Sequence, residues 1–187
     1  FLRKPYMEGA SFSLIVKDVH NGETVFAYDT LRQLTPASVM KTVTTATALE
    51  ILGEDYRFPT TLAYDGSIEK GLLKGNLYIK GSGDPSLGSA HFAPYHKRFL
   101  QEWISALKKV GIHKIQGAVI ADESIFDTEG TSFKWVGEDM GSYYGAGSYG
   151  LCVFDNLYKL GLQTGAPGSR PKLKGTEPEL SGIHFHN

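Results

Sequence analysis

Residues 35–53 limit the possible folds more than any other part of the sequence, because they carry the signals of one capped helix. Thr35 is a residue type favoured at the N-cap, and Pro36 suits the first helical position. Gly53 stands where the C-terminal end of a helix favours glycine. β-branched residues lower the helix propensity of this segment, but its caps and its length predict a helix over residues 36–52.

Segments on both sides of this helix indicate short β-strands joined by turns. Residues 11–18 and 23–28 are rich in β-branched and aromatic side chains and flank Asn21-Gly22, which predicts a β-hairpin. Further along, the patterns predict strands at residues 76–80 and 117–121, and turns at residues 65–66 and 81–85. They also predict an amphipathic helix at residues 96–110. The mixture indicates an α/β (α+β) protein.

The pattern of predicted elements changes near residues 62–66, where a helix-containing part is followed by short β segments with many turns. This change predicts two domains, one over residues 1–64 and a β-rich one over residues 65–187.

Charge and cysteine content exclude several classes of protein. The 187 residues include 19 Lys and Arg against 20 Asp and Glu, whereas a nucleic-acid-binding protein normally carries a basic excess. The single cysteine excludes an intrachain disulfide and a cysteine-rich zinc site. No apolar run approaches the roughly 18–20 residues needed to cross a bilayer. These properties indicate a globular protein without a nucleic-acid partner or a transmembrane segment, and they do not address its oligomeric state.

A Ser-x-x-Lys spacing inside the predicted helix points to nucleophilic chemistry. Side chains three residues apart share a helix face, so Ser38 and Lys41 can approach each other. A serine hydroxyl needs a nearby base to become a good nucleophile, and a lysine made neutral by burial or by a neighbouring cation can be that base. The first helical turn also offers backbone N–H groups for a developing oxyanion.

The spacing alone does not identify a site, because it occurs four times in the sequence. The other three pairs are Ser67/Lys70, Ser105/Lys108 and Ser169/Lys172. Only Ser38 opens a capped and largely apolar helix, where a lysine is costly to bury without a task. From the residues alone, two interpretations stay open: a catalytic pair, and a structural serine beside a lysine that reaches the surface.

Other groups of reactive side chains favour a structural interpretation. Residues 81–86 predict a tight turn in which Asp84 bonds nearby backbone, and His184 and His186 are expected in a solvated tail. Asp122, Glu123 and Asp127 indicate a polar loop at a strand end. We expect Tyr143, Tyr144, Tyr149 and Phe154 to form an aromatic packing cluster, and Cys152 to be a small buried thiol.

The sequence resembles the penicillin-binding protein 4 type of D-alanyl-D-alanine carboxypeptidase, serine peptidase family S13. The resemblance is carried by residues 35–41, by Gly75-Asn76-Leu77-Tyr78-Ile79-Lys80-Gly81-Ser82-Gly83-Asp84-Pro85-Ser86-Leu87, by residues 117–127 and by residues 144–156. These segments occur in consistent order over most of the chain, which is far more specific than a tetrapeptide.

The resemblance implies a partial β-lactamase/transpeptidase-like domain up to about residue 64, followed by an inserted β-rich domain. It implies that Ser38 attacks the terminal D-Ala-D-Ala amide of a peptidoglycan stem peptide and forms an acyl-enzyme, with Lys41 accepting the serine proton. Some relatives also cleave cross-links as endopeptidases. It further implies inhibition by β-lactam antibiotics, no cofactor or metal, and a secreted protein of the periplasm or cell envelope whose targeting segment is absent from this chain.

The sequence departs from the family pattern in one respect. The second family motif, Ser-x-Asn, and the third, Lys-Thr-Gly, occur nowhere in these residues, and Lys174-Gly175-Thr176 has the wrong order. We therefore expect an incomplete N-terminal part that is inactive by itself. Two alternatives remain: a non-catalytic cell-wall binding or interaction module, and a serine β-lactamase.

Overall fold

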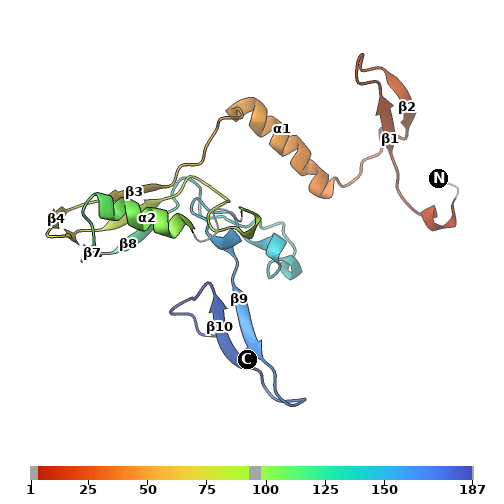
Figure 1. The fold of residues 1–187 in the computed structure, drawn as a ribbon. Helices are drawn as coiled ribbons and strands as arrows, with labels where there is room; N and C mark the ends of the chain where they lie inside the picture. Colours follow the sequence, from red (N-terminus) through yellow and green to blue (C-terminus); the bar gives the residue numbers. More distant parts are fainter. Residues whose placement is uncertain (1–3, 93–97, 187) are drawn as a thin grey trace. The chain divides into compact units, whose positions relative to one another are not determined.

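The structure is a computed structural model that describes residues 4–92 and 98–186 (Figure 1). It divides into two compact units, Phe1–Tyr56 and Arg57–Asn187. Both helices and strands are present, which confirms the predicted α+β character. No helix within the described residues combines the length and the apolar character that a membrane crossing requires.

The first unit contains a hairpin followed by a helix. Its elements are η1 (Pro5–Met7), β1 (Leu14–Lys17), β2 (Thr24–Tyr28), η2 (Ala37–Val39) and α1 (Met40–Leu52). β1 and β2 pair antiparallel, as predicted, and the turn between them places Gly22 at a φ of 76°. This conformation favours glycine, which explains the Asn-Gly signal in the sequence.

The helix begins differently from the prediction and ends as predicted. The expected N-cap, Thr35, is wrong, because Pro36 caps the short 3₁₀ turn η2 that leads into α1, with no side-chain cap hydrogen bond. At the other end, Gly53 has a φ of 81° and donates its N–H to the carbonyl of Leu49 at 3.0 Å. A left-handed glycine in this position is a common end to a helix.

The second unit is built on two three-stranded sheets, ordered β3-β6-β8 and β4-β5-β7. The strands are β3 (Thr61–Tyr64), β4 (Ser67–Glu69), β5 (Leu72–Lys74), β6 (Leu77–Lys80), β7 (Lys114–Ile115) and β8 (Val119–Asp122). β3 pairs with β6, so the residues after Tyr56 belong to this unit. The compact units therefore divide earlier than the predicted boundary after residue 64.

The two sheets share one register and are the halves of a single bent sheet. Thr61 pairs with Lys80 in one half and Glu69 with Leu72 in the other, and both pairs fit the same antiparallel alignment. The parallel pairs, Leu72 with Lys114 and Lys80 with Asp122, also keep one offset. Parallel strands require a crossover connection, and here the crossover contains α2 (Arg98–Lys109).

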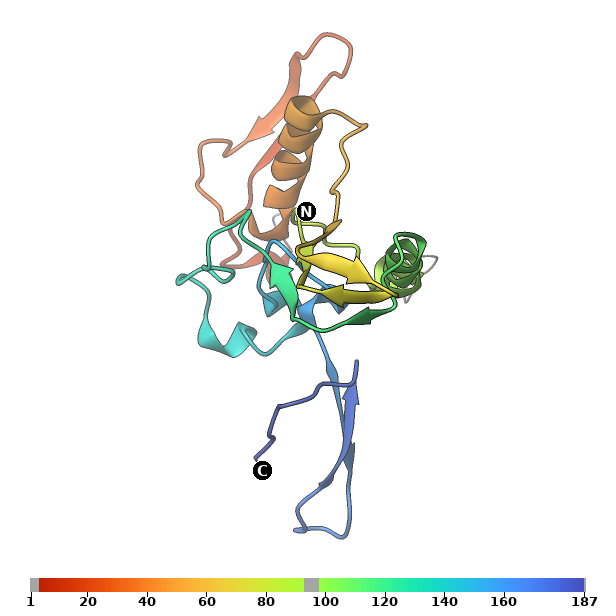
Figure 2. The ribbon, with the colours of Figure 1, turned by 90° about the vertical axis from the view of Figure 1, so that its left-hand side faces the viewer.

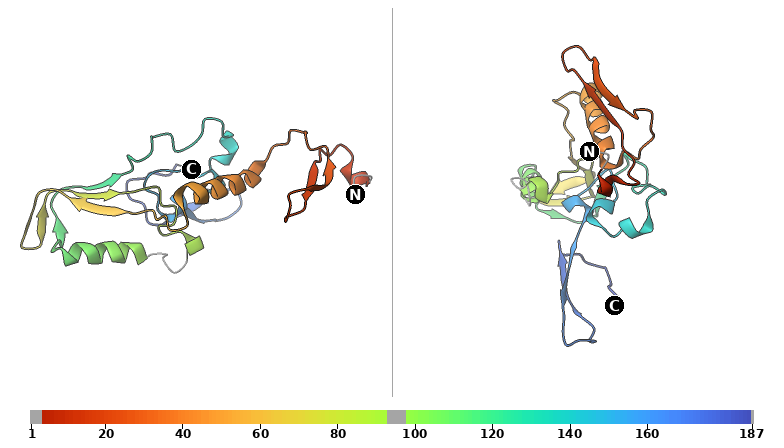
Figure 3. Two further views of the ribbon diagram at one scale, coloured as in Figure 1. Left: turned by 90° about the horizontal axis from the view of Figure 1, so that it is seen from above. Right: turned by 90° about the vertical axis from the view of Figure 1, so that its right-hand side faces the viewer.

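The core of this unit lies between α2 and the sheet (Figure 3). Among the described residues of this unit, the buried apolar side chains are Leu73, Leu77, Phe99 and Ile112. The Phe99 ring packs edge-on against Trp103 and Phe154, with centroids 5.0 and 5.7 Å apart. The predicted helix over residues 96–110 is confirmed from Arg98 onward, and residues 96 and 97 lie outside the described residues.

A second hairpin, which was not predicted, follows the core. β9 (Lys159–Gln163) and β10 (Lys172–Glu177) pair antiparallel (Figure 2). Four short 3₁₀ turns lie earlier in this unit, one before α2 and three between β8 and β9: η3 (Ala90–Phe92), η4 (Gly137–Asp139), η5 (Tyr143–Gly145) and η6 (Phe154–Asn156).

Candidate functional site

Ser38 and Lys41 meet at the start of α1. The Nζ of Lys41 donates a hydrogen bond to the Oγ of Ser38 at 3.0 Å. Ser38 lies in η2 and Lys41 in the first turn of α1, so a single helical turn brings the two groups together. At this separation a proton can pass between the hydroxyl and the amine.

The backbone next to the serine is in an uncommon conformation. Ala37 has a φ of 45°, in the left-handed region that a residue with a Cβ seldom adopts. The N–H of Met40 is shared between the carbonyls of Ala37 and Ser38, which closes the 3₁₀ turn on the serine. Strained residues of this kind cluster at functional sites, where the surrounding structure maintains them.

Two threonine side chains of α1 form hydrogen bonds within the helix. The hydroxyl of Thr45 donates to the carbonyl of Lys41 at 2.8 Å, and that of Thr44 donates to the carbonyl of Met40 at 3.3 Å. These bonds to the preceding turn give the hydroxyls partners within the helix itself. They do not raise the helix propensity of the segment, because back-bonding of this kind slightly destabilises a helix.

The other three Ser-x-x-Lys pairs lack this geometry in the part of the chain that the structure describes. Ser67 lies in β4 and Lys70 follows it at a φ of 48°, whereas Ser105 and Lys108 both lie on α2. The Ser169 hydroxyl donates to the carbonyl of Ala166 at 2.6 Å. Among the four, the hydroxyl-to-amine hydrogen bond is found in the pair that the helix context favoured.

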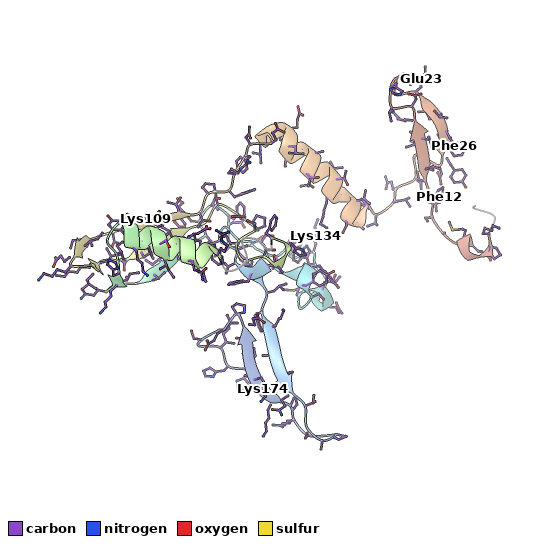
Figure 4. All side chains as sticks on the ribbon, viewed as in Figure 1. Phe12, Glu23, Phe26, Lys109, Lys134 and Lys174 are labelled. Atoms are coloured by element: carbon purple, nitrogen blue, oxygen red, sulfur yellow. The ribbon has the colours of Figure 1, made fainter. Side chains whose placement is uncertain are left out.

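Both members of the pair are exposed, as is nearly all of the first unit. No described residue of Phe1–Tyr56 is buried, and large apolar side chains such as Val43 and Ile51 are 61% and 74% exposed. Figure 4 shows the side chains of α1 standing out on both sides of the helix. An apolar surface of this extent is typical of a face that packs against further protein.

The loop after β6 forms the predicted turn around Asp84. The Oδ1 of Asp84 accepts hydrogen bonds from the N–H and hydroxyl of Ser86, at 2.8 and 2.6 Å. The N–H of Gly83 donates to the carbonyl of Gly150 at 2.7 Å, which ties the loop to a segment far along the chain. Ser82 Oγ is buried without a hydrogen-bond partner among the described residues.

Carboxylates and histidines elsewhere form no assembled site in the described ranges. Asp122 and Asp127 each accept a backbone N–H two residues ahead, from Ser124 and Glu129, both at 3.0 Å. Hydrogen bonds from Ser124 lower the pKa of Asp122; the bond from its side chain has the larger effect and the bond from its backbone the smaller. Within residues 4–92 and 98–186, no three His, Cys, Asp or Glu side chains could hold a metal ion together.

Cys152 differs from the predicted buried thiol. It is half-buried, and its Sγ accepts the N–H of Tyr149 at 3.3 Å and the side-chain amide of Asn156 at 3.2 Å. Its thiol lies 3.2 Å from the Tyr149 carbonyl. The aromatic group is also divided: Phe154 packs in the core, whereas Tyr143 and Tyr144 are 78% and 61% exposed.

A polar cluster at the bend of the sheet was not foreseen from the sequence. The carboxylate of Asp65 accepts the backbone N–H of Asn76 at 2.6 Å, the Asn76 amide at 3.0 Å and the hydroxyl of Tyr78 at 2.8 Å. These hydrogen bonds lower the pKa of Asp65; the one from the Asn76 backbone has the largest effect, followed by those from the side chains of Asn76 and Tyr78. The hydrogen bond to Asp65 raises the pKa of Tyr78. The only features of the sequence that could have indicated this cluster are the dipeptides Asp65-Gly66 and Gly75-Asn76, which lie on facing segments.

Comparison with known proteins assigns the chain to a family. The model of the D-Ala-D-Ala carboxypeptidase 3 (S13) family matches residues 1–186. A D-alanyl-D-alanine carboxypeptidase of Actinomadura sp. (strain R39) is 33% identical over 152 residues, which cover 81% of this chain and 27% of that protein. The D-alanyl-D-alanine carboxypeptidase DacB of Haemophilus influenzae is 29% identical over 133 residues, covering 71% of this chain and 26% of the relative.

Solved structures give the same result. The crystal structure of penicillin-binding protein 4 (dacB) from Haemophilus influenzae matches with a TM-score of 0.70 and 28% identity, covering 85% of this chain and 34% of that one. A structure of the same protein complexed with a novel β-lactam matches with a TM-score of 0.59 and 26% identity, over 86% of this chain and 32% of that one. This chain thus spans about a quarter to a third of the length of these relatives.

Proposed function

This chain belongs to the D-Ala-D-Ala carboxypeptidase 3 (S13) family, and we propose on that basis that it carries the nucleophile and the general base of a serine D-Ala-D-Ala carboxypeptidase. The observation that supports this assignment is the 3.0 Å hydrogen bond between Lys41 Nζ and Ser38 Oγ. It is the arrangement that a serine nucleophile and its activating base require.

In the proposed reaction, the Oγ of Ser38 attacks the carbonyl carbon of the terminal D-Ala-D-Ala amide of a peptidoglycan stem peptide. Lys41, as a neutral amine, accepts the hydroxyl proton and returns it to the departing nitrogen of D-Ala. Water then hydrolyses the resulting ester and releases the enzyme. The same steps applied to a cross-link would make the protein an endopeptidase, and a β-lactam would acylate Ser38 and block it. We place this activity in the periplasm or cell envelope.

The full activity requires more protein than these 187 residues. The chain spans about a third or less of its relatives and contains neither Ser-x-Asn nor Lys-Thr-Gly. Ser38 and Lys41 are exposed, so the described residues do not supply the desolvation that favours a neutral lysine amine. We propose that the rest of a transpeptidase-like domain covers α1, that the second unit is inserted within that domain, and that the chain alone has negligible turnover.

Labelling of the full-length protein with a fluorescent penicillin tests the assignment. Wild-type protein should form a covalent adduct, and Ser38→Ala should form none, because the adduct is an ester of that oxygen. Lys41→Ala should slow labelling by roughly 10²–10⁴-fold, the usual contribution of a general base. Adduct formation should be followed over time by gel fluorescence and located by mass spectrometry.

A matched control uses another serine with the same spacing. Ser105 is exposed on α2 and also precedes a lysine by three residues, so Ser105→Ala should label like wild type. Labelling that survives Ser38→Ala would show that another residue is the nucleophile. Rapid, repeated turnover of a chromogenic cephalosporin would instead indicate a β-lactamase, and full-length protein without any labelling would indicate a non-catalytic wall-binding module.

A further inference from the structure

A cleft in the second unit lies between the C-terminal half of α2 and the chain that leads into β7. Its volume is about 200 Å³, below the roughly 300–1,000 Å³ of sites that enclose a small molecule. Four aliphatic side chains line it: Ile104, Leu107, Ile112 and Ile115. The cleft is thus of a size and character to take an aliphatic side chain of a larger partner.

The rim of this cleft is positively charged. Lys108 and Lys114 line it together with His113, and no carboxylate is among the lining residues. Lys109 ends the same helix and is labelled in Figure 4. Glu69, in β4 of the same sheet, is paired with Lys74 at 2.6 Å. Neither Lys108 nor Lys114 has an ion-pair partner within residues 4–92 and 98–186. Lysines of this kind around an apolar cleft complement a partner that presents carboxylates and an aliphatic group.

The strand beside the cleft has an open edge in the described part of the chain. β7 is the outer strand of the sheet ordered β4-β5-β7. The N–H groups of Lys114 and Gln116 donate to the carbonyls of Gly71 and Leu73 on the β5 side, at 3.0 and 2.9 Å. Because backbone groups alternate in direction along a strand, the N–H of Ile115 between them points away from β5.

We propose that the α2–β7 cleft docks an extended acidic peptide that pairs with the outer edge of β7. Its backbone would bond to Ile115, and an aliphatic side chain would enter the cleft beside Lys108. Carboxylates on the opposite face of the added strand would meet Lys114, which is adjacent to Ile115 in β7 and so faces the other side of the sheet. Strand addition draws affinity from backbone hydrogen bonds and specificity from alternate side chains. A lipid surface could use the lysines but neither the concave cleft nor the strand edge. This binding is separate from the proposed chemistry at Ser38.

The test measures binding of a fluorescein-labelled peptide of alternating Glu and Val residues to the whole chain by fluorescence anisotropy. We expect saturable binding that weakens with salt. A peptide with Lys in place of Glu, and one with the same residues in two blocks, should not bind. Wild-type protein should not bind phosphatidylglycerol vesicles through this site. Absence of binding by the alternating peptide, or vesicle binding that displaces it, would overturn the proposal.

Three variants examine the parts of the site separately. Lys108→Glu with Lys114→Glu should weaken binding by roughly tenfold or more, whereas Lys174→Glu in β10 makes the same kind of charge change elsewhere and should leave it unchanged. Ile115→Pro removes the outward N–H and should also abolish binding, while Ile115→Val keeps that donor and should retain it. Circular dichroism checks that each variant is folded. Unchanged binding by the folded lysine double variant would contradict the charge assignment, whatever the proline variant does.

Discussion

The carboxylate of Asp65 joins the two halves of the bent sheet. It accepts three hydrogen bonds, from the backbone and side chain of Asn76 and from Tyr78. The amide oxygen of Asn76 in turn accepts the N–H of Ala118 at 2.9 Å, so the connection reaches the third strand. The side chains of Asp65 and Asn76 thus add hydrogen bonds to the backbone bonds that continue through the bend, such as that from the Asp65 N–H to the Asn76 carbonyl at 3.1 Å.

This cluster makes the stability of the second unit depend on acid. The pKa of Asp65 is lowered from its ordinary value of 3.8, so the folded protein binds fewer protons than the unfolded chain in that region. The stabilisation is present above the ordinary pKa and is lost as pH falls through the lowered one. Asp65→Asn should therefore lower the Tm at neutral pH, and its difference from wild type should shrink on acidification. Because the group is exposed, we expect a modest effect.

Thermal unfolding followed by circular dichroism from neutral pH to about pH 3 measures this dependence. Asp127→Asn is the matched control, since Asp127 also accepts a backbone hydrogen bond but lies in a loop outside the sheet. An Asp65→Asn protein whose Tm falls in parallel with wild type over the whole range would contradict the role of the carboxylate.

The sequence identified the candidate pair at Ser38 and Lys41 but could not identify Asp65. The pair depends on local spacing along one helix, which a pattern of residues reports directly. The contacts of Asp65 depend on the pairing of distant segments, and the isolated Asp-Gly dipeptide predicts only a turn. The left-handed Ala37 was hidden for another reason: alanine is a good helix former, and only the tertiary chain path reveals its φ of 45°.

Elements were predicted best where periodicity is local and strong. The apolar face of α2 was evident in the sequence, and its helix forms. β6 begins at Leu77, one residue later than predicted, because Asn76 bonds to Asp65 and Ala118 at the bend. β9 and β10 were not predicted, since Gly, Pro and Lys dominate the segment between and around them and their side chains are nearly all exposed.

The packing of α2 against the sheet should contribute strongly to the stability of the second unit. Phe99 is 5% exposed, whereas the adjacent Leu100 is 42% exposed. Phe99→Ala should lower the free energy of unfolding by about 3–5 kcal/mol, because it leaves a cavity against Trp103 and Phe154. Leu100→Ala is the matched control and should cost about 1 kcal/mol or less. Urea unfolding followed by tryptophan fluorescence compares them, and equal losses would show that the helix face is assigned wrongly.

The whole chain joins a unit with a core to a unit without one. The second unit has buried side chains, whereas no described residue of the first is buried. A chain that buries little apolar surface cannot offset the entropy of folding. Residues 57–187 expressed alone should therefore unfold cooperatively on heating, and residues 1–56 alone should show no transition and be rapidly digested by trypsin. A cooperative transition in the shorter piece would refute this.

The shared register of the bent sheet restricts how relatives of this chain can change in length. All three strands pass through the bend without losing alignment. One residue gained or lost there would turn every later side chain of that strand to the opposite face. Insertions and deletions during the divergence of these proteins should therefore gather at the Lys70–Gly71 turn or in the α2 crossover, and spare the bend itself.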